Sequence, residues 1–114
     1  MKTSMKTAKT AMQVVLLGCA MISLAFGAGS AADGKAIFTK SCQGCHGPTG
    51  QGNPAMAKML KAEMKPLGGA EVQGKSDDDL KTAVTQGSGK MKPITGVAGK
   101  QVDDVVAYIR TLKQ

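Results

Sequence analysis

Two cysteines and a histidine stand close together in the segment SCQGCHGPTGQGNP, residues 41–54. Cys42 and Cys45 are three residues apart, His46 follows directly, and the chain contains no other histidine. Thiol and imidazole groups at this spacing can bind a metal ion, form a disulfide, run a dithiol redox cycle or attach a prosthetic group. The rest of the sequence has to decide between these chemistries.

Most of these chemistries need partners that the sequence lacks. A structural zinc ion needs four Cys or His ligands, whereas the chain beyond its N-terminal segment has three, all in one turn. A thioredoxin-like dithiol would lie near a βαβ pattern, and none is present. A plain disulfide between Cys42 and Cys45 remains open, but it would leave the neighbouring histidine unexplained.

The segment instead matches Cys-x-x-Cys-His, the signature of covalent haem attachment. Cysteines three apart on a helical turn point the same way, so that both thiols can form thioethers to one haem c. His46 would then be the proximal axial ligand of the iron. Because no second histidine exists, the other axial position is left to a methionine, a lysine or an open site.

Four methionines follow the motif, and their surroundings differ. Met56 and Met59 have helical spacing together with Leu60, which predicts core packing. Met64 lies at a helix end before a proline, where a gap-filling role is expected. Met91 lies in GSGKMKPITG, a loop bounded by glycine and proline that has no amphipathic period. The Met91 side chain therefore cannot belong to the apolar face of a helix.

The N-terminus is typical of a secretory signal peptide. Three lysines precede an apolar run from 11 to 26, and small residues follow it. We expect cleavage after Ala31, which gives a signal peptide at 1–31 and one domain at 32–114. Acylation of Cys19 is the minority alternative, and a permanent membrane span is disfavoured because the run is short. Each alternative exports the domain to an oxidising compartment, here the periplasm.

Composition limits the size of the core and the class of partner. The chain has 114 residues with no Trp, one Tyr and two Phe, so a bound cofactor is expected to supply part of the core. From Ala32 onward there are 12 Lys and Arg against 8 Asp and Glu, a net charge of +4. An exported chain without Arg clusters is a poor nucleic-acid binder, and an acidic protein partner or an anionic lipid is the better expectation.

The domain is predicted to be all-α, because no segment shows sustained period-two alternation. Four helices are indicated. The first places Gly34 and Phe38 on one face, and the second begins with Asn53 as N-cap and Pro54 as its first residue. The third begins at Ser76 and ends at Gly87. The last carries an apolar stripe made of Val102, Val105, Val106, Ile109 and Leu112.

At this point the chain resembles the small bacterial monohaem class I c-type cytochromes over essentially all of residues 33–114. The matching features are GKAIF, CQGCHG, a capped middle helix, a methionine in a glycine-rich loop, and VVAYIRTLK. The resemblance implies a cytochrome c fold of about four short helices wrapped around one covalently bound haem. It also implies that the first and last helices cross closely at Gly34, Phe38 and Tyr108.

The resemblance extends to the iron ligands. It implies Met91 as the distal axial ligand, because family members place this methionine shortly after such glycines and before a proline. Here Lys92 separates Met91 from Pro93, a departure from the family pattern, and ligation by Lys90 or Lys92 at high pH is the alternative. The family also uses a proline carbonyl to accept the histidine Nδ1–H, and Pro54 is the matching candidate, with Pro48 as a weaker one.

If His46 and Met91 fill both axial positions of the iron, no coordination position is left for a substrate. We therefore do not expect the protein to be an enzyme. The expected function is a soluble, monomeric one-electron carrier between larger redox proteins outside the cytoplasm, with acidic docking surfaces on its partners. The lysines expected to steer such partners are Lys58, Lys61, Lys65, Lys90 and Lys92. The alternatives are a haem-bearing subunit of a larger oxidoreductase and, if Met91 does not ligate iron, a ligand-binding haem sensor.

Overall fold

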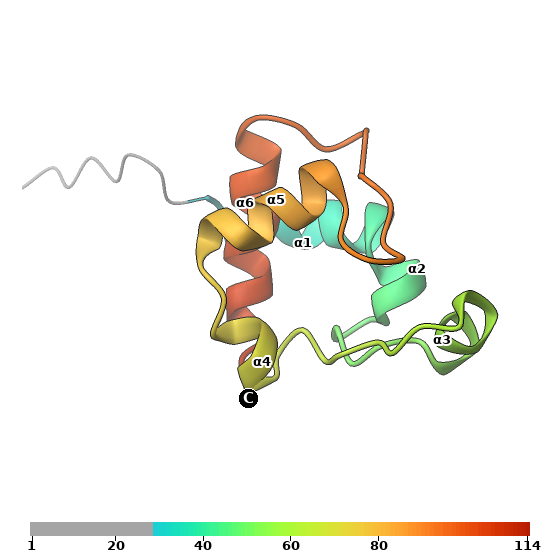
Figure 1. Cartoon of the computed structure of the whole chain (residues 1–114). Coiled ribbons are helices and arrows are strands. Elements are labelled where there is room, and N and C mark those ends of the chain that lie inside the picture. Colours follow the sequence, from blue (N-terminus) through green and yellow to red (C-terminus); the bar gives the residue numbers. More distant parts are fainter. Residues whose placement is uncertain (1–28) are drawn as a thin grey trace, which may run out of the picture.

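The computed structural model describes residues 29–114, and this part of the chain is all-helical with no sheet (Figure 1). The helices are α1 (Ala31–Ser41), α2 (Gln43–His46), α3 (Pro54–Leu60), α4 (Ala70–Gln73), α5 (Asp77–Gln86) and α6 (Lys100–Thr111). Four of these six have seven or more residues, which confirms the predicted fold class. Within residues 29–114, no helix is long and apolar enough to cross a membrane.

The ends of the two middle helices are set by local side chains, as the sequence predicted. The Asn53 side chain accepts hydrogen bonds from Ala55 N–H and Met56 N–H at the start of α3. Ser76 Oγ accepts from Asp79 N–H at the start of α5. Gly87 ends α5 with φ 82°, a conformation that glycine adopts without strain. These caps satisfy backbone groups that a helix end leaves free.

Helices α1 and α6 cross in direct backbone contact. Gly34 is buried, and a Cβ atom at this position would overlap the carbonyl group of Asp104 in α6. One turn further along α1, the Phe38 ring packs against Tyr108 with ring centroids 5.2 Å apart. The crossing implied by Gly34, Phe38 and Tyr108 is therefore confirmed. A glycine is needed because any side chain would separate the two helices.

The hydrophobic core surrounds this crossing and is built mainly from valines. Phe38 and Val105 are its most deeply buried side chains. Leu80 and Val84 bring α5 onto α6. The remaining buried members are Cys42, Val72, Val97, Val102, Val106 and Ile109. Cys42 lies between α1 and α2. No residue of α2 or α3 is buried or belongs to this cluster.

One prediction about packing is wrong. The helical spacing of Met56 and Met59 indicated core positions, but the Met59 side chain is 67% exposed. Met56 is half-buried, and no residue of α3 is fully buried. The reason is that no other helix of residues 29–114 packs closely against the apolar face of α3.

A carboxylate lies buried where the chain enters α1. Asp104 is only 4% exposed, and its Oδ1 atom accepts a hydrogen bond from Ser30 N–H at 2.7 Å. The Lys100 ammonium donates to both Asp104 oxygens, at 2.8 and 3.0 Å. The burial of this carboxylate was not predicted from the sequence.

The two described residues before α1 pack on α6. Ser30 Oγ accepts from Asp33 N–H and caps α1. A Cβ atom on Gly29 would overlap the carbonyl group of Asp103. Cleavage after Ala31 would remove both residues, and the boundary between 1–31 and 32–114 stays a prediction. Cys19 and the apolar run of the signal peptide lie outside the described residues.

Arg110 of α6 ties α4 and α5 to the last helix. Its guanidinium donates to the carbonyl oxygens of Gln73 and Lys75 at 2.9 and 2.6 Å and to Asp77 at 2.9 Å. Gln73 in turn donates to the carbonyl oxygen of Ile109 at 2.9 Å. The planar guanidinium suits several acceptors at once, so this residue positions the start of α5.

Substituting Gly34 by Ala should separate α1 from α6. The added methyl group meets backbone rather than a movable side chain, so we expect the free energy of unfolding to fall by about 1–3 kcal/mol. Denaturant unfolding measures this loss. Gly96→Ala is the control because a Cβ atom there meets nothing within 4 Å. Equal stability of both variants would contradict the close crossing.

The buried Asp104 should make stability depend on acidity. Lys100, followed by Ser30 N–H, holds the pKa of the Asp104 carboxyl below its ordinary value of 3.8. Its contribution to stability is therefore fully present above the unfolded pKa and is lost as the pH falls through the folded pKa. Asp104→Asn should unfold at lower temperature near neutrality and lose less stability in acid than the unmodified protein.

Thermal unfolding from about pH 7 down to about pH 2 tests this difference. Asp78→Asn, which removes an exposed carboxylate from α5, is the control and should follow the unmodified protein. Parallel curves for Asp104→Asn and the unmodified protein would show that the buried carboxylate is not linked to folding.

Candidate functional site

Cys42, Cys45 and His46 are brought together on one turn. The amide N–H of Cys42 donates to the Phe38 carbonyl at 2.9 Å, the last hydrogen bond of α1. The N–H groups of Cys45 and His46 then both donate to the Cys42 carbonyl, at 3.3 and 3.0 Å. Both thiols are free, with Cys42 buried and Cys45 half-buried. The predicted spacing on a single helical turn is confirmed.

The surroundings of the Cys42 thiol favour neutral sulfur. Burial, followed by the neighbouring Cys45, raises the pKa of the Cys42 thiol to about 11. Dithiol exchange needs a thiolate, which the surroundings of Cys42 disfavour. Residues 29–114 also contain no group of three His, Cys, Asp or Glu side chains arranged to hold a metal ion. A thioether is a neutral sulfur species and is compatible with this buried position.

His46 is held in its neutral form with an unused nitrogen. Burial lowers the pKa of the imidazole, and neutral imidazole is the form that ligates iron. Its Nδ1 atom is buried and has no hydrogen-bond partner. Such an orphaned atom costs about 1–3 kcal/mol and calls for an explanation. Ligation of iron by the other ring nitrogen leaves Nδ1 free to donate to an acceptor, and two free thiols beside a neutral imidazole are a donor set that fits the expected haem.

The bond predicted from His46 Nδ1 to the Pro54 carbonyl is not formed in this structure. Pro54 instead occupies the first position of α3, where its fixed φ favours helix entry and its missing N–H costs nothing. Pro48 does not supply the acceptor either. The helix-opening role of Pro54 is observed, and its role as acceptor is not.

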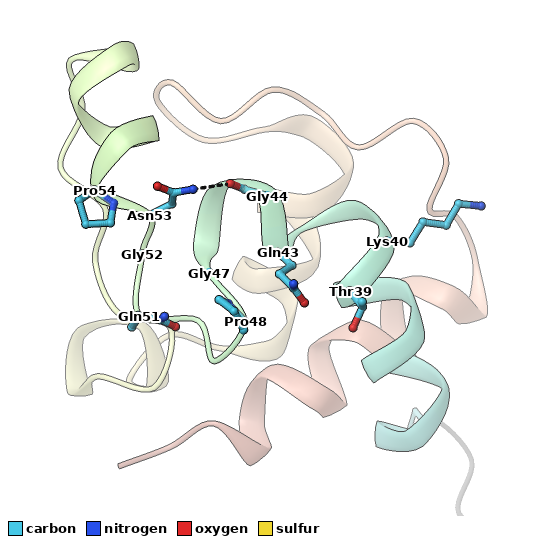
Figure 2. Close-up of a pocket in the computed structure, with 10 residues that line it drawn as sticks. All are labelled: Thr39, Lys40, Gln43, Gly44, Gly47, Pro48, Gln51, Gly52, Asn53 and Pro54. Atoms are coloured by element: carbon cyan, nitrogen blue, oxygen red, sulfur yellow. Dashed lines mark hydrogen bonds between the residues drawn. The ribbon is translucent and has the colours of Figure 1, made fainter.

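Asn53 connects the cysteine turn to α3. Its side-chain amide donates to the Gly44 carbonyl at 3.0 Å, as Figure 2 shows, while its oxygen caps α3. The backbone continues this link, because Asn53 N–H donates to the Cys45 carbonyl at 2.9 Å and Gly52 N–H to the His46 carbonyl at 2.7 Å. The sequence predicted the cap but not the bond to Gly44. These bonds fix the turn by protein contacts alone.

A pocket of about 530 Å³ lies beside this turn (Figure 2). The residues that line it are Thr39, Lys40, Gln43, Gly44, Gly47, Pro48, Gln51, Gly52, Asn53 and Pro54. Cys42, Cys45 and His46 do not line it, although their sequence neighbours do. The pocket is therefore not where these three side chains would hold a prosthetic group.

Met91 lies on a separate loop between α5 and α6, and its backbone is fixed there. Its N–H donates to the Ser88 carbonyl and its carbonyl accepts from Ser88 N–H, both at 2.9 Å. A Cβ atom on Gly87 would lie 2.5 Å from the Met91 oxygen, so glycine is needed beside it. The side chain is half-buried. The small SGKM turn was not predicted, although its glycine is a signal for one.

Comparisons with known proteins agree with this arrangement. A family model described as cytochrome c matches residues 31–113. Cytochrome c-554(547) of Halothiobacillus neapolitanus is 32% identical over 91 residues, which cover 75% of this chain and all of that protein. The solved structure of the c-type cytochrome KustC0563 is 25% identical with a TM-score of 0.60, covering 72% of this chain and 99% of the other.

Substitutions at Asn53 should separate its two roles. Asn53→Ala loses both the cap of α3 and the bond to Gly44, and we expect a loss of about 1–2 kcal/mol in the free energy of unfolding. Asn53→Asp keeps an oxygen for the cap but has no amide to donate, so it should lose less. Denaturant unfolding ranks the two variants. An Asp variant as unstable as the Ala variant would mean that the cap contributes nothing.

Proposed function

Since the chain belongs to the cytochrome c family, we propose that it is a one-electron carrier with haem c held by Cys42, Cys45, His46 and Met91. Members of this family are typically carriers rather than enzymes, and the family implies covalent haem c. The observation that carries the proposal is the turn from Cys42 to His46, which places two free thiols beside an imidazole whose pKa is lowered by burial.

Each residue of the turn has a separate task. Cys42 and Cys45 bind the haem through thioether bonds, and His46 supplies a neutral imidazole as axial ligand. Bound haem c supplies an iron that accepts and releases one electron. Asn53 and Gly52 hold the turn in place through their bonds to the backbone at 44–46, so little has to rearrange when the cofactor is bound.

Met91 is proposed as the second axial ligand. Its position is supported by the turn from Ser88 to Met91 and by the close approach of Gly87, which together limit the movement of its backbone. A thioether ligand raises the reduction potential relative to nitrogen ligation. Lys90 and Lys92 flank the position and are exposed, which suits contact with a partner better than ligation in the folded protein at neutral pH.

The site of action and the partners are part of the same proposal. The signal-peptide pattern at the N-terminus and the covalent haem implied by the family support a carrier in the periplasm, which would exchange electrons with redox proteins that present acidic surfaces. Four of the five lysines expected to steer these partners are exposed without an ion pair to a described residue: Lys58, Lys61, Lys90 and Lys92. Lys65 pairs with Glu71 and is less available.

Optical spectroscopy of the purified holoprotein tests the ligand set. We expect a ferric methionine-to-iron charge-transfer band in the unmodified protein and its loss in Met91→Ala. We also expect the ferrous unmodified protein to bind no carbon monoxide, because both axial positions are filled, whereas the variant should bind it.

Met59→Ala is the matched control, since the same side chain is removed from an exposed position on α3. Its spectrum should equal that of the unmodified protein. A charge-transfer band that survives in Met91→Ala would remove Met91 from the iron. Carbon monoxide binding by the unmodified ferrous protein would favour a haem sensor over a carrier.

A further inference from the structure

The loop at residues 50–52 holds the backbone of the cysteine turn at His46. Gly52 N–H donates to the His46 carbonyl at 2.7 Å, and Gly50 N–H donates to the Gly47 carbonyl at 3.2 Å. Gly50 and Gly52 are both buried, with φ of 75° and 93°. The position of the His46 backbone therefore depends on what keeps this loop in place.

A second segment, residues 64–68, lies against the loop. Leu67 N–H donates to the Gly50 carbonyl at 2.8 Å. A Cβ atom on Gly52 would lie 3.0 Å from Met64 Cβ and 3.2 Å from the Met64 carbonyl oxygen. A Cβ atom on Gly50 would lie 3.0 Å from Leu67 Cβ. Both glycines are needed at these close approaches, because Met64 and Leu67 occupy the space that their side chains would take.

The end of the chain after α6 contacts the same segment. Gln114 N–H donates to the Gly68 carbonyl at 3.0 Å, and a Cβ atom on Gly68 would lie 2.0 Å from the Leu112 carbonyl oxygen. Leu67 and Leu112 both pack against the hydrophobic core. In Figure 1 the chain that leaves α3 runs back toward α4 and the C-terminus. Segment 64–68 therefore connects the core assembly to the loop that holds His46.

The helix that carries the histidine has little packing of its own. Helix α2 has four residues, Gln43–His46, and none of them is buried. The orientation of a metal-bound histidine depends on the groups that hold it, and loss of such a group typically costs about 10–100-fold in metal affinity or activity. For His46 the contacts described above act on the backbone carbonyl, through the loop at 50–52.

We propose that Met64 and Leu67, here called the proximal brace, are positioning residues for His46. They hold the loop at 50–52, and the loop holds the His46 carbonyl, so the imidazole keeps one position on the iron. A well-placed imidazole stabilises ferric iron, so the brace should lower the reduction potential. This inference rests on the proposed ligation by His46, and it assigns a role to a segment that supplies no ligand.

Gly52→Ala should displace the loop from the brace. The added methyl group meets Met64, and φ of 93° is strained for alanine. Because His46 would then be less well placed, we expect the reduction potential to rise and the hyperfine-shifted ring protons of His46 to move. Voltammetry and NMR of the ferric holoprotein measure these two effects.

Gly99→Ala is the matched control for this substitution. Gly99 also has a positive φ, 57°, but a Cβ atom there meets nothing within 4 Å. The control therefore carries backbone strain without contact with a brace. It should leave the potential and the His46 signals unchanged.

Leu67→Ala tests the brace separately, including the case in which Gly52→Ala does not fold with haem. It shortens the side chain beside Gly50 and keeps the bond from Leu67 N–H. We expect shifts in the same direction but smaller. Leu67→Met should restore both readings, since a side chain of similar volume is usually tolerated. Val102→Ala, which shortens a buried side chain near the start of α6, is the control for lost core packing.

Denaturant unfolding of every variant separates positioning from stability. The proposal requires shifted potentials and His46 signals in Gly52→Ala and Leu67→Ala, and unshifted ones in both controls. Lost stability with an unchanged potential would make the brace a structural contact only. An equal shift in Val102→Ala would show that the potential follows overall stability. Either result overturns the proposal. If the unmodified ferric protein has no hyperfine-shifted His46 protons, the proposed ligand set itself fails, and the role of the brace fails with it.

Discussion

The crossing of α1 and α6 is the contact on which the other positions depend. The absence of a side chain at Gly34 lets the two helix backbones touch, and the Phe38 and Tyr108 rings close the contact one turn later. Since α1 runs directly into Cys42, the crossing also determines where the cysteine turn begins. Arg110 of α6 donates hydrogen bonds to Gln73 and Asp77, so the position of α6 also determines where α5 begins. The end of α5 then leads through Gly87 to the loop of Met91.

Two parts of the molecule differ in what holds them. The α1, α5 and α6 assembly has a core of its own, made of valines with Phe38, and a buried carboxylate that is fully hydrogen-bonded. The cysteine turn and α3 are held mainly by backbone bonds and by Asn53, and they leave His46 Nδ1 without a partner. A chain with so few aromatic residues has little else with which to cover this region. The part that lacks protein packing is the part that carries the cofactor motif.

Prediction from the sequence succeeded where the signal is local. The caps at Asn53 and Ser76, the glycine end of α5 and the apolar stripe of α6 depend on neighbouring residues, and each was found. It failed where a partner far along the chain decides the outcome. Helical spacing alone placed Met59 in the core, because it says which residues share a face and not whether another element covers that face. The same limit hid the burial of Asp104 and the bond of Asn53 to Gly44.

The amino-acid sequence by itself indicated haem attachment, since Cys42, Cys45 and His46 match the Cys-x-x-Cys-His motif whatever the fold. It also determined the helical class through periodicity and caps. Only the tertiary structure decided which nitrogen of His46 is left unsatisfied, how tightly the Met91 backbone is held, and that α3 presents Met59 and Lys61 outward. These properties depend on which distant residues meet, and local sequence patterns do not carry that information.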